Sequence, residues 1–126
     1  MRFMMMLPAP AGVLETVVPA PDKELVNAMR RYNEEMKKAG VLLASEGLHA
    51  PSKGARLRMS GGKPVITDGP FAEAKEVIAG FWMIRVGSKE EALEWARRCP
   101  LPEGGVMEIR QVFEDADFPP ELQKGS

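Results

Sequence analysis

The sequence predicts an α+β fold in which two helices cover one face of an antiparallel sheet. Two segments carry apolar residues at helical spacing, and short apolar or alternating runs typical of strands stand before, between and after them. Neither helix can bury its apolar stripe alone, so both must pack on one sheet. The order strand, helix, strand, hairpin, strand, helix, strand is that of a ferredoxin-like sandwich.

The composition indicates one domain and excludes several classes of partner. A chain of 126 residues suits a single core, and 17 Lys and Arg against 18 Asp and Glu favour neither nucleic acid nor an anionic membrane. The single Cys cannot form an internal disulfide, and there is no signal peptide or apolar run of about 20 residues, which predicts a cytoplasmic protein. We expect one domain over residues 1–113 and a polar, partly mobile tail over 114–126.

The first third of the chain predicts a strand, a loop and a helix. The segment 2–7 is apolar after its first residue and predicts a buried strand ending at the following proline. Four prolines and a glycine in 8–21 indicate a surface loop. A helix then begins at Asp22 and ends at Gly40. Its apolar residues at helical spacing are Leu25, Met29, Tyr32, Met36 and Ala39.

The middle of the chain predicts a strand over 41–48 and then a hairpin. The hairpin strands are 55–59 and 64–67, because the glycine pair between them supplies the positive φ angles of a tight turn. Gly61, Gly62 and Lys63 do not form a phosphate loop, since the required spacing and the following helix are missing.

The last third predicts a strand, a helix and a final strand. The strand over 77–86 is apolar on both faces. Ser88 and Glu91 have the spacing of a capping box that starts a helix, which stops before Pro100. The final strand covers 105–113.

The two-layer arrangement leaves one face of the sheet bare. With strands as apolar as 81–86, that face would form a larger exposed patch than monomers usually tolerate. The sequence therefore predicts a homodimer that packs sheet on sheet.

A turn-forming and charged stretch over residues 67–76, called the motif from here on, is the first place to expect chemistry. An Asp in a turn normally accepts the N–H two residues on, but Pro70 has none. Asp68 must therefore accept from the N–H of Phe71 as a helix cap does, find another donor, or point its carboxylate into a cleft. A capped turn and a ligand-directed carboxylate are both open, and the two can coexist.

Four stretches of the chain match a known pattern, and they are Glu46-Gly47-Leu48, Thr67-Asp68-Gly69-Pro70-Phe71-Ala72-Glu73-Ala74-Lys75-Glu76, Gly80-Phe81 and Glu91-Ala92-Leu93-Glu94-Trp95-Ala96. They resemble the YCII-related or DGPF-domain family, and the resemblance covers residues 1–113. The resemblance implies a dimeric ferredoxin-like α+β barrel. Most members of the family are uncharacterised, a few resemble small lyases such as dehydrochlorinases, and related domains are fused to sigma factors.

Family members proposed to be enzymes pair a His on the first helix with an Asp on a later strand. The resemblance implies that Asp68 matches the Asp, whereas the first helix has Asn33 near the place of the His. Asn cannot take up a proton at ordinary pH, so a His–Asp pair requires His49 from the end of the second strand.

Three hypotheses for function remain open, and the sequence does not decide whether the protein is an enzyme or what it binds. The first is a lyase or isomerase with Asp68 as general base and His49 or Lys75 as acid or electrostatic helper, which requires a carboxylate pKa raised by burial. The second is a ligand-binding or regulatory dimer without catalysis, and the third gives the motif a role in dimer assembly alone. Candidate binding residues are Phe71, Glu73, Glu46, Asn33, Phe81 and Trp82.

No cofactor or metal is predicted. One His with scattered carboxylates has none of the ligand spacings typical of a metal site. The predicted partners are a second copy of the chain and a small molecule.

Overall fold

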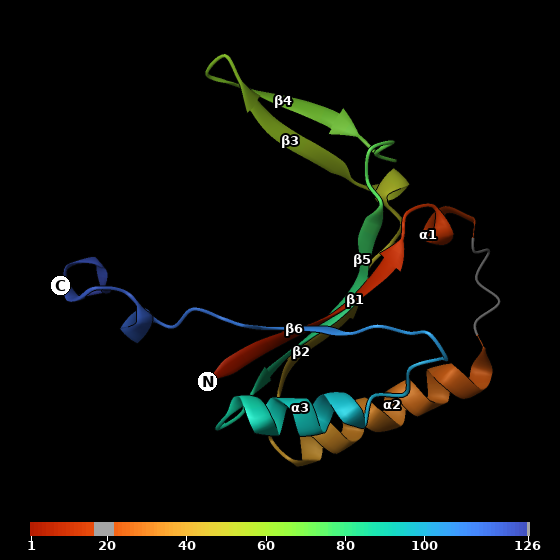
Figure 1. The fold of residues 1–126 in the computed structure, drawn as a ribbon, viewed down its shortest axis with the longest axis vertical. Helices are drawn as coiled ribbons and strands as arrows, with labels where there is room; N and C mark the ends of the chain where they lie inside the picture. Colours follow the sequence, from red (N-terminus) through yellow and green to blue (C-terminus); the bar gives the residue numbers. More distant parts are fainter. Residues whose placement is uncertain (17–21, 126) are drawn as a thin grey trace.

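The structure, a computed structural model, describes residues 1–16 and 22–125 (Figure 1). Part of the predicted loop, residues 17–21, lies outside the described residues. Three short 3-10 turns, η1 to η3, accompany the helices and strands. The elements are β1 (Arg2–Pro10), α1 (Val13–Thr16), α2 (Lys23–Lys38), β2 (Leu42–Gly47), η1 (Pro51–Lys53), β3 (Ala55–Ser60), β4 (Lys63–Asp68), β5 (Glu76–Arg85), α3 (Lys89–Arg97), β6 (Glu108–Gln111), η2 (Asp115–Asp117) and η3 (Pro120–Leu122).

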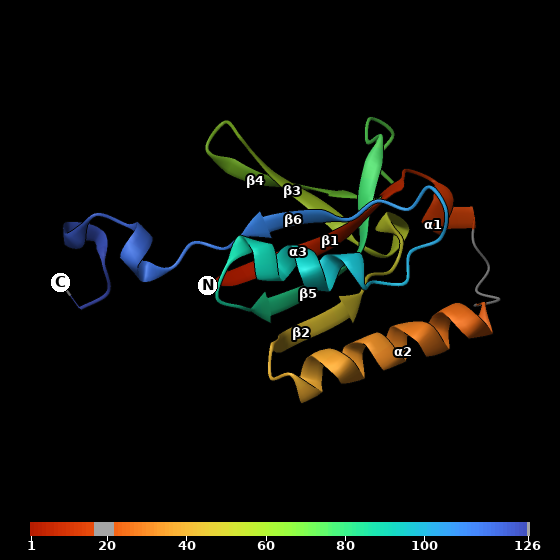
Figure 2. The same cartoon turned by 60° about the horizontal axis from the view of Figure 1, so that its bottom comes forward.

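The predicted α+β architecture is confirmed. A four-stranded sheet has the order β2-β5-β1-β6 with every neighbouring pair antiparallel, while β3 and β4 form a separate hairpin. Helices α2 and α3 lie on the same side of the sheet (Figures 1 and 2). This arrangement is consistent with a ferredoxin-like fold. In the described part of the chain the sheet is open and does not close into a barrel.

The core lies between the two helices and the sheet. The Tyr32 ring of α2 meets Trp82 and Trp95 edge to face at centroid distances of 5.6 and 6.5 Å, and its hydroxyl donates to the Trp95 carbonyl at 2.7 Å. Burial raises the pKa of Tyr32, so this hydroxyl stays protonated. The buried apolar residues are Phe3, Met5, Tyr32, Met36, Val41, Trp82, Ile84, Val86, Ala92, Trp95 and Cys99.

The predicted ends of both long helices are confirmed, with one change of partner. Asp22 caps α2, and Gly40 follows its end at a φ of 74°. At α3 the Ser88 hydroxyl accepts the N–H of Glu91 at 3.1 Å. The Glu91 carboxylate accepts from Gly87, one residue before the cap that a capping box would use, at 2.9 Å. The free N–H groups at this helix end therefore still gain partners.

The prediction that the first strand stops before Pro8 is wrong. The strand β1 continues to Pro10, with a register shift between Leu7 and Pro8. Its partner β6 pairs only with Phe3–Met6, so the later part of β1 has β5 as its strand neighbour and lies at an edge. Proline lacks the N–H that a central strand needs, and an edge tolerates this loss.

The last strand is shorter than the predicted 105–113. The strand β6 covers only Glu108–Gln111, because Gly104 takes a φ of 79° and the Gly105 N–H donates to Pro102 in a turn. At the other end of β6, the Val112 N–H donates to the carbonyl of Arg2, which is the first residue of β1. Beyond Val112, β1 therefore has no residue left to pair with. The lengths of these two strands thus depend on each other.

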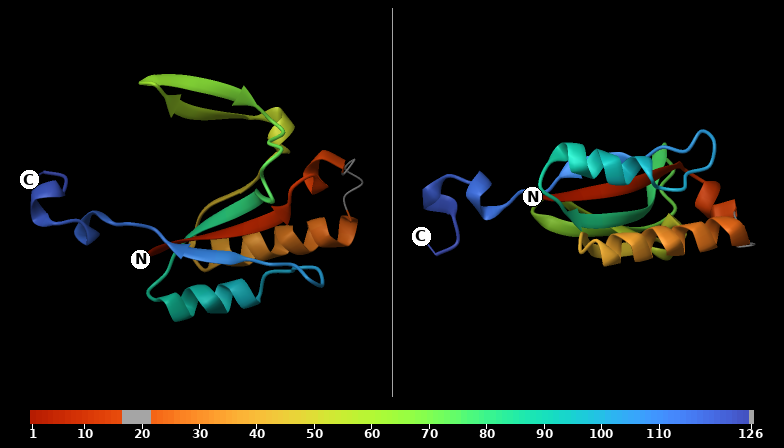
Figure 3. Two further views of the ribbon diagram at one scale, coloured as in Figure 1. Left: turned by 45° about the horizontal axis from the view of Figure 1, so that its top comes forward. Right: turned by 90° about the horizontal axis from the view of Figure 1, so that it is seen from below.

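Three surfaces of the chain remain without a layer over them. The open face is the side of the sheet away from the helices, where Met4, Met6, Phe81 and Met83 are only half-buried. The hairpin arm, residues 55–68, stands on the open-face side (Figures 1 and 3). The tail, residues 113–125, extends beyond the sheet on the far side from the base of the arm.

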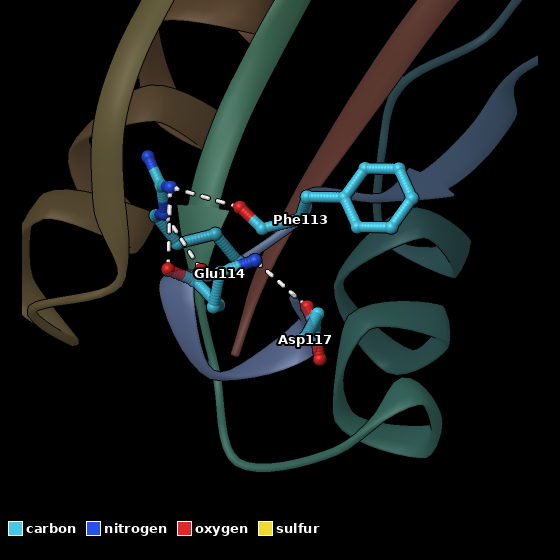
Figure 4. A network of polar contacts seen from close by, with 4 residues as sticks. Phe113, Glu114 and Asp117 are labelled. Carbon is cyan, nitrogen blue, oxygen red and sulfur yellow. Dashed lines mark hydrogen bonds and ion pairs between the residues drawn. The ribbon is translucent and has the colours of Figure 1, made fainter. Parts of the chain in front are cut away.

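The tail is held to the first strand at its root. The Arg2 guanidinium donates to both Glu114 carboxylate oxygens, at 2.8 and 3.2 Å, and the Glu114 N–H donates to Asp117 at 2.7 Å (Figure 4). The bond from Arg2 lowers the pKa of Glu114. The structure thus gives the beginning of the tail a defined place beside β1.

The one-sided core predicts a large cost for removing side-chain volume between the helices and the sheet. Ile84→Ala should lower the free energy of unfolding by about 2–5 kcal/mol, since Ile84 is fully buried. The matched variant Val106→Ala, at a side chain 59% exposed, should change it by less than about 0.5 kcal/mol. Urea denaturation followed by circular dichroism measures both. Equal losses in the two variants would contradict the placement of the core.

Candidate functional site

A cleft of about 510 Å³ lies where the hairpin arm leaves the body of the domain. One wall is the chain from the end of β2 through η1 to the start of β3, and the other is the motif with the start of β5. This volume is within the range usual for small-molecule sites. The lining residues are Leu48, His49, Ala50, Pro51, Lys53, Gly54, Ala55, Arg56, Phe71, Ala74, Glu76, Val77 and Ile78.

The charged groups of the cleft are mostly basic and surround an apolar wall. His49, Lys53 and Arg56 line it, and Glu76 is the one carboxylate among the lining residues. In the described part of the chain the side chain of Lys53 has no ion pair or hydrogen bond. A free ammonium beside apolar surface suits an anion that carries an apolar body.

Arg56 joins the arm to the motif. Its guanidinium lies 4.0 Å from the centre of the Phe71 ring, a cation–π contact, and it forms an ion pair with Glu73. The pKa of Glu73 is lowered, first by a hydrogen bond between its carboxylate and its own backbone. The charge and the hydrogen bond of Arg56 lower it further. Two side chains of the motif therefore hold the base of the arm in place.

The backbones of the motif and of η1 touch at Gly69. The Gly69 N–H donates to the Gly54 carbonyl at 3.1 Å, and a Cβ at Gly69 would lie 1.9 Å from the Pro51 carbonyl oxygen. Only glycine permits this approach. The Gly69–Pro70 peptide is cis. The contact brings the wall that carries His49 and Lys53 against the motif.

A protein-family model described as the YCII-related domain matches residues 1–116 of this chain. The chain belongs to the YCII-related family. The match ends within η2, at the beginning of the tail. An uncharacterized protein of Rhizobium meliloti (strain 1021) is 38% identical over 92 residues, which are 71% of this chain and 71% of that protein.

The predicted catalytic residues of this YCII-related domain lie in and beside the cleft. His49 is exposed and lines it. Asp68 is the last residue of β4 and is exposed at the rim, opposite the lining residue Ala55. No described residue donates a hydrogen bond to its carboxylate, so the bond from the Phe71 N–H, one of the three alternatives open for Asp68, is not observed. Lys75 is exposed next to the lining Glu76, and its carbonyl accepts from the N–H of Ala11 at 2.8 Å.

The predicted binding residues are divided among three places. Phe71 lines the cleft, and Glu73 lies beside it on Arg56. The pair Glu46 and Phe81, opposite each other on β2 and β5, lies on the open face.

The remaining two predicted binding residues lie on the helix side of the sheet. Trp82 donates from its ring nitrogen to the Asn33 side-chain oxygen at 2.7 Å, between β5 and α2. The side chain of Asn33, which the sequence resemblance set near the place of a helical His, therefore satisfies the indole N–H of Trp82. A ligand-binding role for Asn33 and Trp82 stays a prediction.

The sequence interpretation missed Lys53, Arg56 and the contact of Gly69 with Pro51. The alternation of Arg56 and Arg58 was a usable signal, because it places both on one face of the hairpin and Ala55 and Leu57 on the other. The glycine contact gave no local signal, since its two sides are distant in sequence.

Neither a reactive thiol nor a metal site is found among the described residues. The thiol of Cys99 is buried at the end of α3, which raises its pKa to about 11, so it stays protonated at neutral pH and is a poor nucleophile. Among the described residues no cluster of His, Cys, Asp or Glu could hold a metal ion. None of the described helices has the length and apolar character to cross a membrane.

The Gly69 contact predicts that a single methyl group will displace the motif. Gly69→Ala should lower the free energy of unfolding by about 1–3 kcal/mol and expose the amides of 50–56, because the new Cβ overlaps the Pro51 carbonyl. Gly47→Ala is the matched control, with nothing within 4 Å of its Cβ and an expected change below about 0.5 kcal/mol. Urea denaturation and amide hydrogen exchange measure both effects. Unchanged exchange over 50–56 in Gly69→Ala would refute this account of the motif.

Proposed function

We propose that this YCII-related protein binds a small organic acid in the cleft between the motif and the base of the hairpin arm. The observation that carries the proposal is the position of Lys53, His49 and Arg56 around an apolar wall in a cleft of about 510 Å³. Ligand sites typically combine such apolar walls with a few polar groups that fix orientation.

Each part of the cleft has a role in this proposal. The ammonium of Lys53 is free of protein partners and receives the carboxylate, assisted by His49. Arg56 is already shared with Glu73, so it contributes mainly by fixing Phe71 under its guanidinium. The apolar body of the ligand packs on Phe71, Val77 and Ile78.

The second candidate is acid–base chemistry of the lyase or isomerase type on the ligand bound there. It is favoured by the Asp68 carboxylate, which accepts no hydrogen bond from a described residue and stands at the rim of the cleft. Asp68 would be the general base and His49 or Lys75 the acid or electrostatic helper. In the single chain Asp68 is exposed, so its use as a general base requires that the ligand or a second chain cover it.

The proposal also includes a homodimer formed through the open face. Met4 lies opposite Met83, and Met6 opposite Phe81, so these four side chains form one apolar strip along the centre of the sheet. Glu108 and Arg110 of β6 flank the strip with opposite charges. In a two-fold dimer formed through this face, the apolar strip of one copy packs against the apolar strip of the other.

The ligand proposal predicts selective binding of small aromatic and hydroxylated acids. A thermal-shift screen of such acids should give hits, and calorimetry should show a roughly tenfold weaker affinity for Lys53→Gln, because one charge-assisted hydrogen bond is lost. The matched control Lys63→Gln, at the tip of the arm, should bind like wild type.

Three outcomes distinguish the ligand site, the acid–base candidate and the ligand-binding or regulatory alternative. Equal affinity in Lys53→Gln and wild type, or a ligand seated away from the cleft in a structure, contradicts the site. Turnover of the bound acid that Asp68→Asn abolishes, with binding and unfolding free energy unchanged, supports the acid–base candidate. Binding without turnover supports the ligand-binding or regulatory alternative.

The dimer proposal predicts that one charge on the open face separates the subunits. Met83→Lys should sediment as a monomer at concentrations where wild type is a dimer, because a buried unpaired ammonium opposes the contact. Val106→Lys, at an exposed residue outside the sheet, is the control and should leave the dimer intact. A wild-type protein that sediments as a monomer, or a Met83→Lys dimer, would refute it.

A further inference from the structure

The hairpin arm has one apolar and one basic face. Cross-strand partners share a face, so Leu57 with Ile66 and Met59 with Pro64 form the apolar side. Successive residues alternate, which places Arg56, Arg58 and Lys63 on the opposite side. The arm is therefore an amphipathic ribbon.

The apolar face of the arm is uncovered. Every residue of β3 and β4 is exposed, with Met59 at 64% and Ile66 at 67%. A two-stranded hairpin by itself is at best marginally stable in water. An arm of this composition therefore gains stability from a partner that buries its apolar side.

The tail is a second projecting segment with exposed apolar side chains. Phe113 is 71% and Leu122 67% exposed, and the rings of Phe113 and Phe118 lie 5.5 Å apart. The arm and the tail together hold seven of the thirteen exposed large hydrophobic residues in the described part of the chain.

Hydrogen bonds within the tail define its shape. Asp115 accepts the N–H of Lys124 at 3.0 Å, and the Gln123 amide donates to the Phe118 carbonyl at 2.9 Å. Figure 4 shows the root of the tail, where Phe113 points away from the Glu114 and Asp117 bonds. A segment ordered before it binds loses less conformational entropy on binding.

The two segments carry opposite charges. The arm, residues 55–68, contributes three cations, Arg56, Arg58 and Lys63, and one carboxylate, Asp68 at its base. Over 113–125 the tail holds one cation and four carboxylates, Glu114, Asp115, Asp117 and Glu121. Arg58 and Lys63 have no ion pair with another described residue. The cations lie on the face of the arm opposite Leu57 and Ile66, so they attract the acidic tail toward the arm and leave the docking contact itself to the apolar face.

The tail of the same chain is not placed to cover the arm. The arm rises on the open-face side from one end of the sheet, and the tail leaves from the other end (Figures 1 and 3). The bonds from Arg2 to Glu114 hold the root of the tail there. The occupant must come from another molecule.

We propose that the tail of one copy of this chain docks on the apolar face of the hairpin arm of a second copy. In a two-fold dimer the contact forms twice, since each copy has one arm and one tail. The base of the arm, Ala55 and Arg56, lines the cleft, so the partner's tail also stabilises one wall of the ligand site. The contact goes beyond the proposed open-face dimer and uses other residues, and alone it is expected to be weak enough that Met83→Lys still sediments as a monomer.

Cross-linking between single-cysteine variants tests this proposal. In a full-length Cys99→Ala background, Met59→Cys marks the arm, Leu122→Cys the tail, and Val106→Cys an equally exposed position on neither segment. Two variants are mixed and treated with a short bismaleimide, and the hetero-dimer is quantified by mass spectrometry. We expect the arm–tail pair to cross-link at least about tenfold faster than the arm–Val106 pair. Replacing two apolar residues of the arm together, Leu57→Ser and Ile66→Ser, should abolish this difference in rate.

Each alternative result is decisive. Equal rates for the two pairs, or an arm–tail rate unaffected by Leu57→Ser with Ile66→Ser, overturns the proposal. Binding of the arm to anionic phospholipid vesicles without selective cross-linking assigns the arm to a membrane and also overturns it. Selective cross-linking that persists with Met83→Lys on the open face supports the tail–arm contact even where the open-face dimer fails.

Discussion

The burial of only one face of the sheet is the constraint on which the rest of this structure depends. Helices α2 and α3 supply a core between themselves and the sheet, where Met5, Met36 and Ile84 are fully buried. No third layer is available in the described part of the chain, so the open face, the hairpin arm and the tail keep apolar side chains in solvent. Their exposure motivates each assembly that we propose.

The motif that marks the YCII-related family has a structural task that is visible without any ligand. Gly69 lets the backbone of η1 approach, and Phe71 with Glu73 holds Arg56 at the base of the arm. The motif thus joins the sheet, the arm and the wall of the cleft. A site role for Asp68 is compatible with this task, because its carboxylate takes no part in these contacts.

The cleft and the proposed contacts between copies meet at the base of the arm. Arg56 faces the motif on one side of the arm, while Leu57 and Ile66 face the other way. A partner on the apolar side would fix the arm from outside, and the motif fixes it from inside. Ligand binding and assembly are therefore expected to stabilise each other, since both order the same short segment.

The sequence alone determined the local elements, because their signals are local. The cap at Asp22, the stop at Gly40, the hairpin turn at Gly61 with Gly62 and the family marker at 67–76 were all predicted from neighbouring residues. Only the tertiary structure decided the lengths of β1 and β6, which depend on pairing with distant strands. It also placed Asn33 on Trp82 in the core and Arg56 on the motif, because pairing partners far apart in sequence leave no periodic pattern to identify them.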